Sequence, residues 1–274
     1  IGRRWTNVRD VFGDVRTASS TMNMRDLTVL IPSWNDAEAL SVTLTAFASL
    51  TAELKDRLDI VVSDGASSDH TLDVLAAHAD LVRHVSSRPD HGVYDAMNRG
   101  LSAATGSHVW VVGAGDVPDQ DGLARALAVL TSDASATAHA WSVTALPPLE
   151  PGVPARFEPN WGGKLTWKNT MHHQGLLAPR AWLERHPFDT SLNILGDYAQ
   201  MLEWRNMGHH VACHPERVLC RVAPAGLSRT FNVALYREEW RMKRARLRGP
   251  RLWAQPFWLV AKWAFKQVST VAKI

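Results

Sequence analysis

Carboxylates stand at three places in this sequence where the neighbouring residues could put them to chemical use. Asp64 follows a run of apolar residues, and Asp116 follows another through the glycine-rich segment 113–115. Glycines let a bulky anion approach the backbone, and a carboxylate in such a loop can bind a divalent cation or lie beside phosphate. Asp197 begins a segment with helical spacing, where a carboxylate could accept a proton from a hydroxyl group.

Alternating strand and helix patterns must position these side chains. Apolar runs predict strands over residues 27–31, 58–62, 81–85 and 109–112. Apolar residues at helical spacing predict helices over residues 36–50, 71–79, about 93–104 and about 119–131. Such alternation indicates right-handed βαβ units and a largely parallel sheet. Ligands of open α/β sheets bind at the carboxyl ends of strands, where Asp64 and Asp116 are expected.

The pattern changes after residue 140. Pro32 is expected to end the first strand, and five prolines between positions 147 and 159 interrupt the later pattern. We therefore interpret residues 140–178 as a long functional loop, a crossover or a lid. The remaining predicted elements are helices over residues 179–185 and 196–207, the second ended by Gly208, and short strands over residues 210–213 and 218–222.

Length and composition fit one α/β domain with an appendage. The chain has 274 residues, of which 46% are hydrophobic and 21% charged, so disorder is not expected. Two cysteines make no disulfide framework and favour a reduced, cytosolic compartment. The net charge of +3 is uneven: residues 229–274 carry a balance of +9, and the first 228 residues a balance of −6. A basic, aromatic tail on an acidic body suggests an anionic partner for the tail.

Four segments that carry the candidate residues occur in a set order. They are residues 31–35, residues 64–71, residues 87–100 with 113–116, and His173-Gln174 followed by residues 195–198. Together they resemble the inverting nucleotide-sugar glycosyltransferases of family 2, and segment 92–100 is similar to segments of the bacterial surface-polysaccharide branch. The resemblance covers residues 25–228. It implies the α/β GT-A fold, with a Rossmann-like, mostly parallel central sheet flanked by helices.

The resemblance also implies a role for each candidate residue. Asp64 would hydrogen-bond the nucleotide base, Asp197 would be the catalytic base, and Asp116 would bind a divalent cation, Mn²⁺ or Mg²⁺. The other residues that it assigns to the donor site are Pro32, Ser33, Asn35, Arg88, Asp90, Asp95, Asn98, His173 and Gln174. The reaction implied is inverting transfer of a sugar from a nucleotide diphosphate to a hydroxyl of a lipid-linked or polysaccharide acceptor.

Two positions depart from the family pattern. Gly65 stands where the family usually has a second acid, and segment 113–116 holds one clear carboxylate where many members have more. A cation held mainly by substrate phosphates needs only one or two carboxylates, so a metal remains compatible with this segment.

Each candidate carboxylate has a simpler structural alternative. Asp116 could cap the helix that starts near Asp119, and Asp197 could be a charge favoured at a helix N-terminus. Asp64 and Asp69 could be turn residues. The histidines and cysteines after residue 172 match no standard zinc spacing. A non-catalytic nucleotide-sugar-binding or scaffold protein is one alternative function. A sugar nucleotidyltransferase is another, although it would need a basic, glycine-rich loop after the first strand.

The ends of the chain are treated separately. Residues 1–24 are interpreted as an N-terminal extension, and residues 229–274 as a basic, aromatic helical segment. Lysines at 262, 266 and 273 lie on one stripe of the predicted helix 257–273, which fits an anionic membrane surface meeting residues 237–273. The alternative is a helix packed on the domain or on a second copy. No nucleic-acid motif accompanies the charge. The expected location is the cytoplasmic inner face of the cell membrane, as a peripheral protein.

Overall fold

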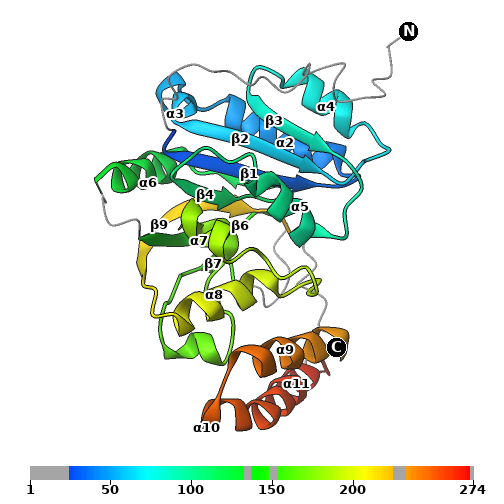
Figure 1. Ribbon diagram of the computed structural model, residues 1–274, viewed down its shortest axis with the longest axis vertical. Coiled ribbons are helices and arrows are strands. Elements are labelled where there is room, and N and C mark those ends of the chain that lie inside the picture. Colours follow the sequence, from blue (N-terminus) through cyan, green and yellow to red (C-terminus); the bar gives the residue numbers. More distant parts are fainter. Residues whose placement is uncertain (1–24, 133–136, 148–153, 225–232, 272–274) are drawn as a thin grey trace.

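The computed structural model describes residues 25–132, 137–147, 154–224 and 233–271, with side chains to residue 264 (Figure 1). The described residues form one curved sheet with helices on both faces. The C-terminal helices lie at the end of the molecule opposite β3 and α4 (Figure 1). The predicted N-terminal extension lies outside the described residues, so its interpretation stays a prediction.

A block of four parallel strands forms one half of the sheet. These strands are β1 (Leu27–Ser33), β2 (Leu58–Asp64), β3 (Val82–Ser87) and β4 (His108–Val111). Their order is β3-β2-β1-β4, with Ser33 paired to Asp64 and Asp64 paired to Ser87. Three strands therefore end side by side, and their polar terminal residues meet at one edge. This confirms the four strands predicted from apolar runs, each shifted by a few residues.

The other half of the sheet mixes directions. It consists of β8 (Leu176–Pro179), β6 (Ala138–Ala145), β9 (Val211–Val222), β5 (Val117–Pro118) and β7 (Arg156–Phe157). Strand β8 is antiparallel to both β4 and β6, and β9 is parallel to β6. Strands β5 and β7 add antiparallel pairs at β9 and β6. The sheet therefore begins as the predicted parallel block and continues as a mixed sheet.

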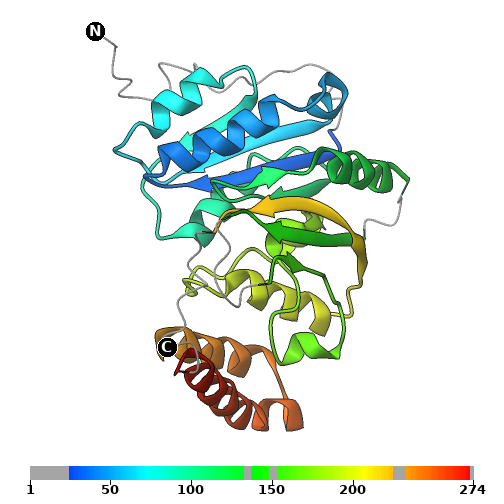
Figure 2. The ribbon, with the colours of Figure 1, turned by 180° about the vertical axis from the view of Figure 1, so that it is seen from behind.

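Helices cover both faces, and each face has its own apolar core. On one side lie α2 (Ala37–Ala48), α3 (Ala52–Asp56), α4 (Thr71–Ala77) and α6 (Gln120–Ser132) (Figure 2). On the other lie α5 (Val93–Leu101), α7 (Arg180–Arg185) and α8 (Gly196–Asn206) (Figure 1). Alternate residues of β1 serve the two cores: Val29 and Ile31 face the first, and Leu30 faces the second. Gly100 lets α5 approach β1, because a Cβ there would lie 2.2 Å from Leu30 Cδ1.

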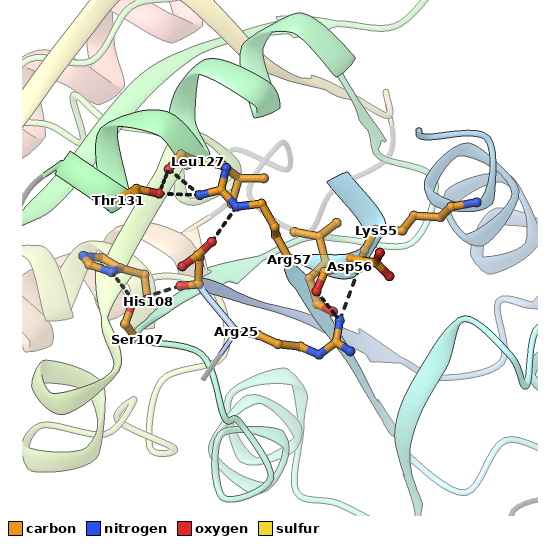
Figure 3. A network of polar contacts seen from close by, with 10 residues as sticks. Arg25, Lys55, Asp56, Arg57, Ser107, His108, Leu127 and Thr131 are labelled. Carbon is orange, nitrogen blue, oxygen red and sulfur yellow. Dashed lines mark hydrogen bonds and ion pairs between the residues drawn. The ribbon is translucent and has the colours of Figure 1, made fainter. Parts of the chain in front are cut away.

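The edge of the sheet where Asp64 and Asp116 follow their strands is the acidic edge. A polar network fixes the strand ends at the opposite edge (Figure 3). Arg25 donates to the carbonyl oxygens of Asp56 at 2.6 Å and of Leu58 at 2.8 Å. Arg57 pairs with Asp26 at 2.5 Å and donates to Leu127 O in α6 at 2.8 Å. Ordinary hydrogen bonds each contribute about 0.5–1.5 kcal/mol, and those to charged groups more. The network thus holds β1, β2 and α6 together at this edge.

Three expectations from the sequence are wrong. Strand β1 continues through Pro32. Proline has no backbone N–H to donate, but β4 pairs with β1 only as far as Leu30, so no hydrogen bond of the sheet is lost there. Residues 140–178 are not one long loop, since they contribute most of β6 and most of β8. One long strand, β9, replaces the two predicted short ones, and its register to β6 shifts around Ser142.

The C-terminal segment packs on the domain. It contains α9 (Val233–Arg246), α10 (Gly249–Trp253) and α11 (Gln255–Val271). Lys243 is fully buried and pairs with Glu239 at 2.8 Å, and Lys262 of α11 pairs with the same carboxylate at 2.7 Å. These two lysines therefore point into the protein and not toward a membrane, which corrects the predicted lysine stripe at Lys262. Side chains beyond residue 264 lie outside those described. Within the described ranges, no helix has the length and apolar character to cross a bilayer.

Candidate active site

The loops after β1 and β2 are locked together by short polar side chains. Asn35 has a positive φ of 49°, and its Oδ1 accepts the backbone N–H of Ser68 at 2.7 Å. The Asn35 N–H donates to Ser67 Oγ at 2.7 Å. Asparagine tolerates this left-handed conformation better than most residues, which explains its place in the turn. Ser33 is buried at the end of β1, with Pro32 half-buried before it.

Asp64 lies fully buried at the end of β2. Its carboxylate accepts the N–H of Ser67 at 3.0 Å and the hydroxyl groups of Ser67 and Ser87. A buried carboxylate needs such donors to offset its lost hydration. Oδ1 accepts one hydrogen bond and keeps a further lone pair, but the side chain is fully buried, so contact with a nucleotide base requires neighbouring side chains to move. Asp69, by contrast, has a structural role: it accepts N–H groups at the starts of α2 and α4.

Trp34 is a functional candidate that the sequence reasoning missed. Its ring is 68% exposed, yet it stands between the buried ends of β1 and β2. A Cβ added at Gly65 would lie 3.0 Å from Trp34 Cδ1 and 2.7 Å from Asp90 Oδ2. Gly65, where the family pattern expects an acid, thus leaves room for the indole. An exposed aromatic ring in this position can stack on a planar base.

The acidic residues of segment 87–100 are neutralised by an arginine that was not among the predicted site residues. Arg99 pairs with Asp90 at 3.0 Å and lies 3.9 Å from Asp95. It also donates to the carbonyl oxygen of Arg88 at 3.0 Å. Arg99 therefore shapes the loop, while the side chain of Arg88 is exposed beside it. Asn98 uses both ends of its amide on the backbone of Phe188, so its hydrogen bonds hold the 188 loop.

Asp116 is almost completely buried, at 2% exposure, between β4 and the end of β9. Its carboxylate accepts the N–H of Gly113 at 2.8 Å and that of Ala223 at 2.9 Å. Burial raises its pKa, and these hydrogen bonds oppose the shift. Asp116 does not cap α6, because Asp119 does so by accepting Gly122 N–H at 2.9 Å. The capping alternative for Asp116 is therefore wrong.

Asp197 and His173 form an ion pair beside Asp116. His173 lies in the 3₁₀ turn η2 (His173–Gly175), and its Nδ1 lies 3.1 Å from Asp197 Oδ2. Burial acts to raise the pKa of Asp197, but the hydrogen bond and charge of His173 outweigh it and lower that pKa. Burial acts against protonation of His173, yet Asp197 and then Asp116 raise its pKa. Two carboxylates that are far apart in sequence thus act on one imidazole.

Gln174 and Trp110 hold this turn against the sheet. Trp110 Nε1 donates to the Gln174 carbonyl at 2.8 Å, which ties η2 to β4. The Gln174 side chain contacts His172 Nδ1 and acts to lower the pKa of Asp116. The predicted pair at 173 and 174 therefore connects the two carboxylates that the sequence assigned to the metal and to the base.

Tyr94 of α5 and Gly196 of α8 set the position of Asp197. Tyr94 is buried, stacks on Phe188 at 5.7 Å, and donates its hydroxyl to Ile194 O at 2.7 Å. Burial, and after it the charge of Asp197, raise the pKa of Tyr94, so the phenol stays protonated. A Cβ at Gly196 would lie 2.7 Å from the Tyr94 ring. Only glycine there allows the first turn of α8 to bring Asp197 against His173.

The residues present fit a cation held mainly by phosphate. Among the described residues, no cluster of three or more His, Cys, Asp or Glu side chains is arranged to hold a metal by itself. Each Asp116 oxygen accepts one backbone N–H and keeps a further lone pair. Asp116 can therefore supply one ligand to a cation whose other ligands are diphosphate oxygens and water.

A sheet with a parallel half, carboxylates at its strand ends and the Asp197–His173 pair beside them is the arrangement of a GT-A fold. Solved structures agree in fold. TarS 1–349 of S. aureus in complex with UDP-GlcNAc has a TM-score of 0.63 at 15% identity, covering 79% of this chain and 65% of that one. The mannosyltransferase PcManGT of Pyrobaculum calidifontis, in complex with GDP-Man and Mn²⁺, has a TM-score of 0.59 at 20% identity, covering 91% and 76%.

The family follows from the sequence comparison. The model for glycosyl transferase family 2 matches residues 28–186, and the chain belongs to this family. A curated relative, the PGL/p-HBAD biosynthesis glycosyltransferase of Mycobacterium bovis, is 37% identical over 108 residues, which are 37% of this chain and 40% of the relative. The match spans less than half of that relative's length.

Proposed function

We propose that the protein transfers a sugar, with inversion, from a nucleotide diphosphate to a hydroxyl group of a lipid-linked or polysaccharide acceptor in surface glycan synthesis. One observation carries the proposal: Asp197, His173 and Asp116 meet at the acidic edge of the sheet although they are far apart in sequence. Membership of family 2 and the M. bovis relative support the reaction class and the biosynthetic setting.

Asp197 is the base in this proposal. Inverting displacement at an anomeric carbon needs a group that accepts the acceptor's proton on the side opposite the leaving diphosphate. The lowered pKa of Asp197 keeps its carboxylate ionised, and His173 holds it through Oδ2 while leaving Oδ1 toward Tyr94 and its own helix turn. A general base of this kind contributes about 10²–10⁴ to the rate.

Residues at the ends of β1, β2 and β3 bind the donor in this account. Trp34 stacks on the base, Asp64 hydrogen-bonds it after neighbouring side chains move aside, and Arg88 lies exposed where the diphosphate would pass. A divalent cation bound by Asp116 and the diphosphate would neutralise the leaving group. PcManGT, whose complex includes Mn²⁺, is the neighbour that supports this choice of cofactor. The bonds that Asp90, Asp95 and Asn98 make inside the domain give them a part in shaping the loop.

The acceptor is proposed to be presented at the inner face of the cell membrane. Large apolar side chains of α10 and α11 are exposed, namely Trp253 (74%), Phe257 (78%), Val260 (66%) and Trp263 (47%). Exposed arginines at 241, 244, 248 and 251 stand on the same segment. An apolar face beside arginines is the composition that binds anionic bilayers peripherally.

Two alternatives make different predictions. A non-catalytic nucleotide-sugar-binding protein would bind donor without turnover, and the single carboxylate at 113–116 is the feature in its favour. A nucleotidyltransferase would need basic residues after β1, where the chain has Trp34, Asn35 and Asp36.

The test is a nucleotide-release screen over UDP- and GDP-sugars, with and without Mn²⁺ and Mg²⁺, using membrane extract as acceptor source. The expected result is metal-stimulated release with one donor and a product of inverted anomeric configuration by NMR. Donor binding without release from any sugar would favour the non-catalytic alternative. A product of retained configuration would refute Asp197 as the base.

A further inference from the structure

A buried carboxylate of the C-terminal segment reaches the loop that leads into the candidate base. Glu238 on α9 is 8% exposed. Its Oε1 accepts the N–H groups of Ile194 and Leu195, both at 2.8 Å, and its Oε2 accepts that of Asn193 at 3.0 Å. Three consecutive N–H groups thus converge on one carboxylate. This residue lies beyond residues 28–186, where the family model matches.

These N–H groups precede α8, whose first turn carries Asp197. Leu195 is the N-cap of α8 and supplies no side-chain hydrogen bond to it. The N–H groups at a helix start lack partners within the helix and carry the positive end of its dipole. The Leu195 N–H is one of these helix-start groups, and Glu238 accepts it from α9, while Asp197 Oδ1 accepts the N–H of Tyr198 in the first turn. Hydrogen bonds to a charged acceptor are about twice as strong as neutral ones.

The same loop is held from its other side. Tyr94 donates to the Ile194 carbonyl at 2.7 Å, while Glu238 accepts the Ile194 N–H at 2.8 Å. One peptide unit on each side of Ile194 is thereby fixed between α5 and α9. Asp197 follows three residues later and must meet His173 at 3.1 Å. A shift of the loop therefore moves the carboxylate relative to the imidazole.

Glu238 is itself held by a buried polar cluster. Its neighbour Glu239 pairs with Lys243 and Lys262, and Lys243 also donates to Trp167 O at 2.7 Å and to Gln255 Oε1 at 2.9 Å. These contacts fix α9 to α11 and to the turn after η1 (Gly163–Thr166). The position of Glu238 thus depends on the whole C-terminal segment.

We propose that Glu238 is a positioning residue for Asp197, and that the C-terminal segment is consequently a part of the catalytic centre. The inference rests on the proposed function for the identity of the base. The role proposed for α9 is in turnover and not in donor binding. The donor residues Trp34 and Asp64 lie at the ends of β1 and β2, away from α9 (Figure 1).

The experiment compares Glu238→Gln with Met242→Ala in the full-length chain. Glutamine keeps the shape but places an NH₂ group against at least one backbone N–H, so the triple contact is lost. Met242 is buried on the same helix at 1% exposure and belongs to the apolar core, so its truncation loosens α9 without touching residues 193–195. The readouts are kcat, donor KM, melting temperature and deuterium exchange of the amides of residues 193–195.

For Glu238→Gln we expect kcat to fall about 10²-fold, the loss typical of a catalytic group displaced by about 1 Å. Donor KM should stay within about twofold, because ground-state binding is untouched. Exchange at residues 193–195 should accelerate. Met242→Ala should lower the melting temperature while retaining most of kcat.

Three results would overturn the proposal. Faster exchange in Glu238→Gln with unchanged kcat would show that the loop does not position the base. An equal loss of kcat in Met242→Ala would reduce the effect to general loosening of α9. Protected amides in a wild-type protein that turns over no donor would mean that the proposed function has failed and that Glu238 is a helix cap alone.

Discussion

Gly196→Ala is the substitution whose outcome follows most directly from the packing around the candidate base. The added Cβ would lie 2.7–2.8 Å from three atoms of the Tyr94 ring. Real Cβ atoms essentially never approach within 3.0 Å, so either the ring or α8 must move. The ring is confined by its stacking on Phe188 and by its hydrogen bond to Ile194, and α8 therefore takes up the shift.

The expected magnitude separates stability from activity. Overpacking costs about 1–3 kcal/mol. Alanine regains up to about 1 kcal/mol of helix propensity over glycine. The net loss of unfolding free energy should therefore be about 0–3 kcal/mol, which leaves a typically stable protein folded. Displacement of Asp197 by a large fraction of an ångström should lower kcat by about 10²-fold. Initial rates of nucleotide release and thermal melting measure the two effects.

Matched controls make the reasoning refutable. Gly163→Ala places its Cβ in open space, with no atom within 4 Å, and should leave kcat unchanged. In a Tyr94→Ala background the collision is absent, so adding Gly196→Ala should cost little more, a coupling that a double-mutant cycle measures. Additive losses in that cycle would show that contact with Tyr94 is not what places Asp197.

Other features of the site lead to separate expectations. Trp34→Ala should raise donor KM by about 10–100-fold with kcat unchanged, as base stacking contributes about 1–3 kcal/mol, and an unaltered KM would remove Trp34 from the donor site. Because the pKa of Asp116 is raised, protons compete with the cation, and Mn²⁺ affinity measured by calorimetry should weaken as pH falls. This loss should occur at a higher pH than the protonation of Asp197, whose pKa is lowered. A pH-independent affinity would contradict this expectation. Replacing Trp253 and Phe257 by serine should reduce binding to anionic vesicles, whereas the same change at exposed Phe157 should not; equal binding by both variants would rule out the α10–α11 face.

The sequence predicted correctly those strands and helices whose pattern of apolar residues is set within a single element. Strands β1, β2 and β4 are buried runs rich in apolar residues, while β3 is buried only at Val82, and the helices between them have helical periodicity, so local pattern and fold agree. Strand β6 was missed because Trp141 and Val143 face one core while only small residues, such as Ala140, face the other. The alternation of large apolar and polar residues along β6 is therefore weak, and the prolines after residue 146 favoured the prediction of a loop.

Contacts between distant segments were beyond such reasoning. His173 and Asp197 could be singled out by resemblance, but their ion pair depends on η2 being tied to β4. Lys243 lies in the basic segment 229–274, yet it is buried and is paired with Glu239 and Gln255. One signal did exist for Glu238: it and Glu239 are the two acids among residues 229–274, which hold eleven basic residues. Isolated acids in a basic segment indicate specific partners.

Asp197→Asn tests the central claim most directly. The substitution keeps the shape of the side chain and an acceptor for His173, but it removes the charge that accepts the proton. Nucleotide affinity by calorimetry and nucleotide release by initial rate should be measured on the same preparation. The account predicts unchanged affinity with turnover reduced by about 10²–10⁴. Turnover within about tenfold of the wild type, at unchanged affinity, would contradict Asp197 as the base of a sugar transferase.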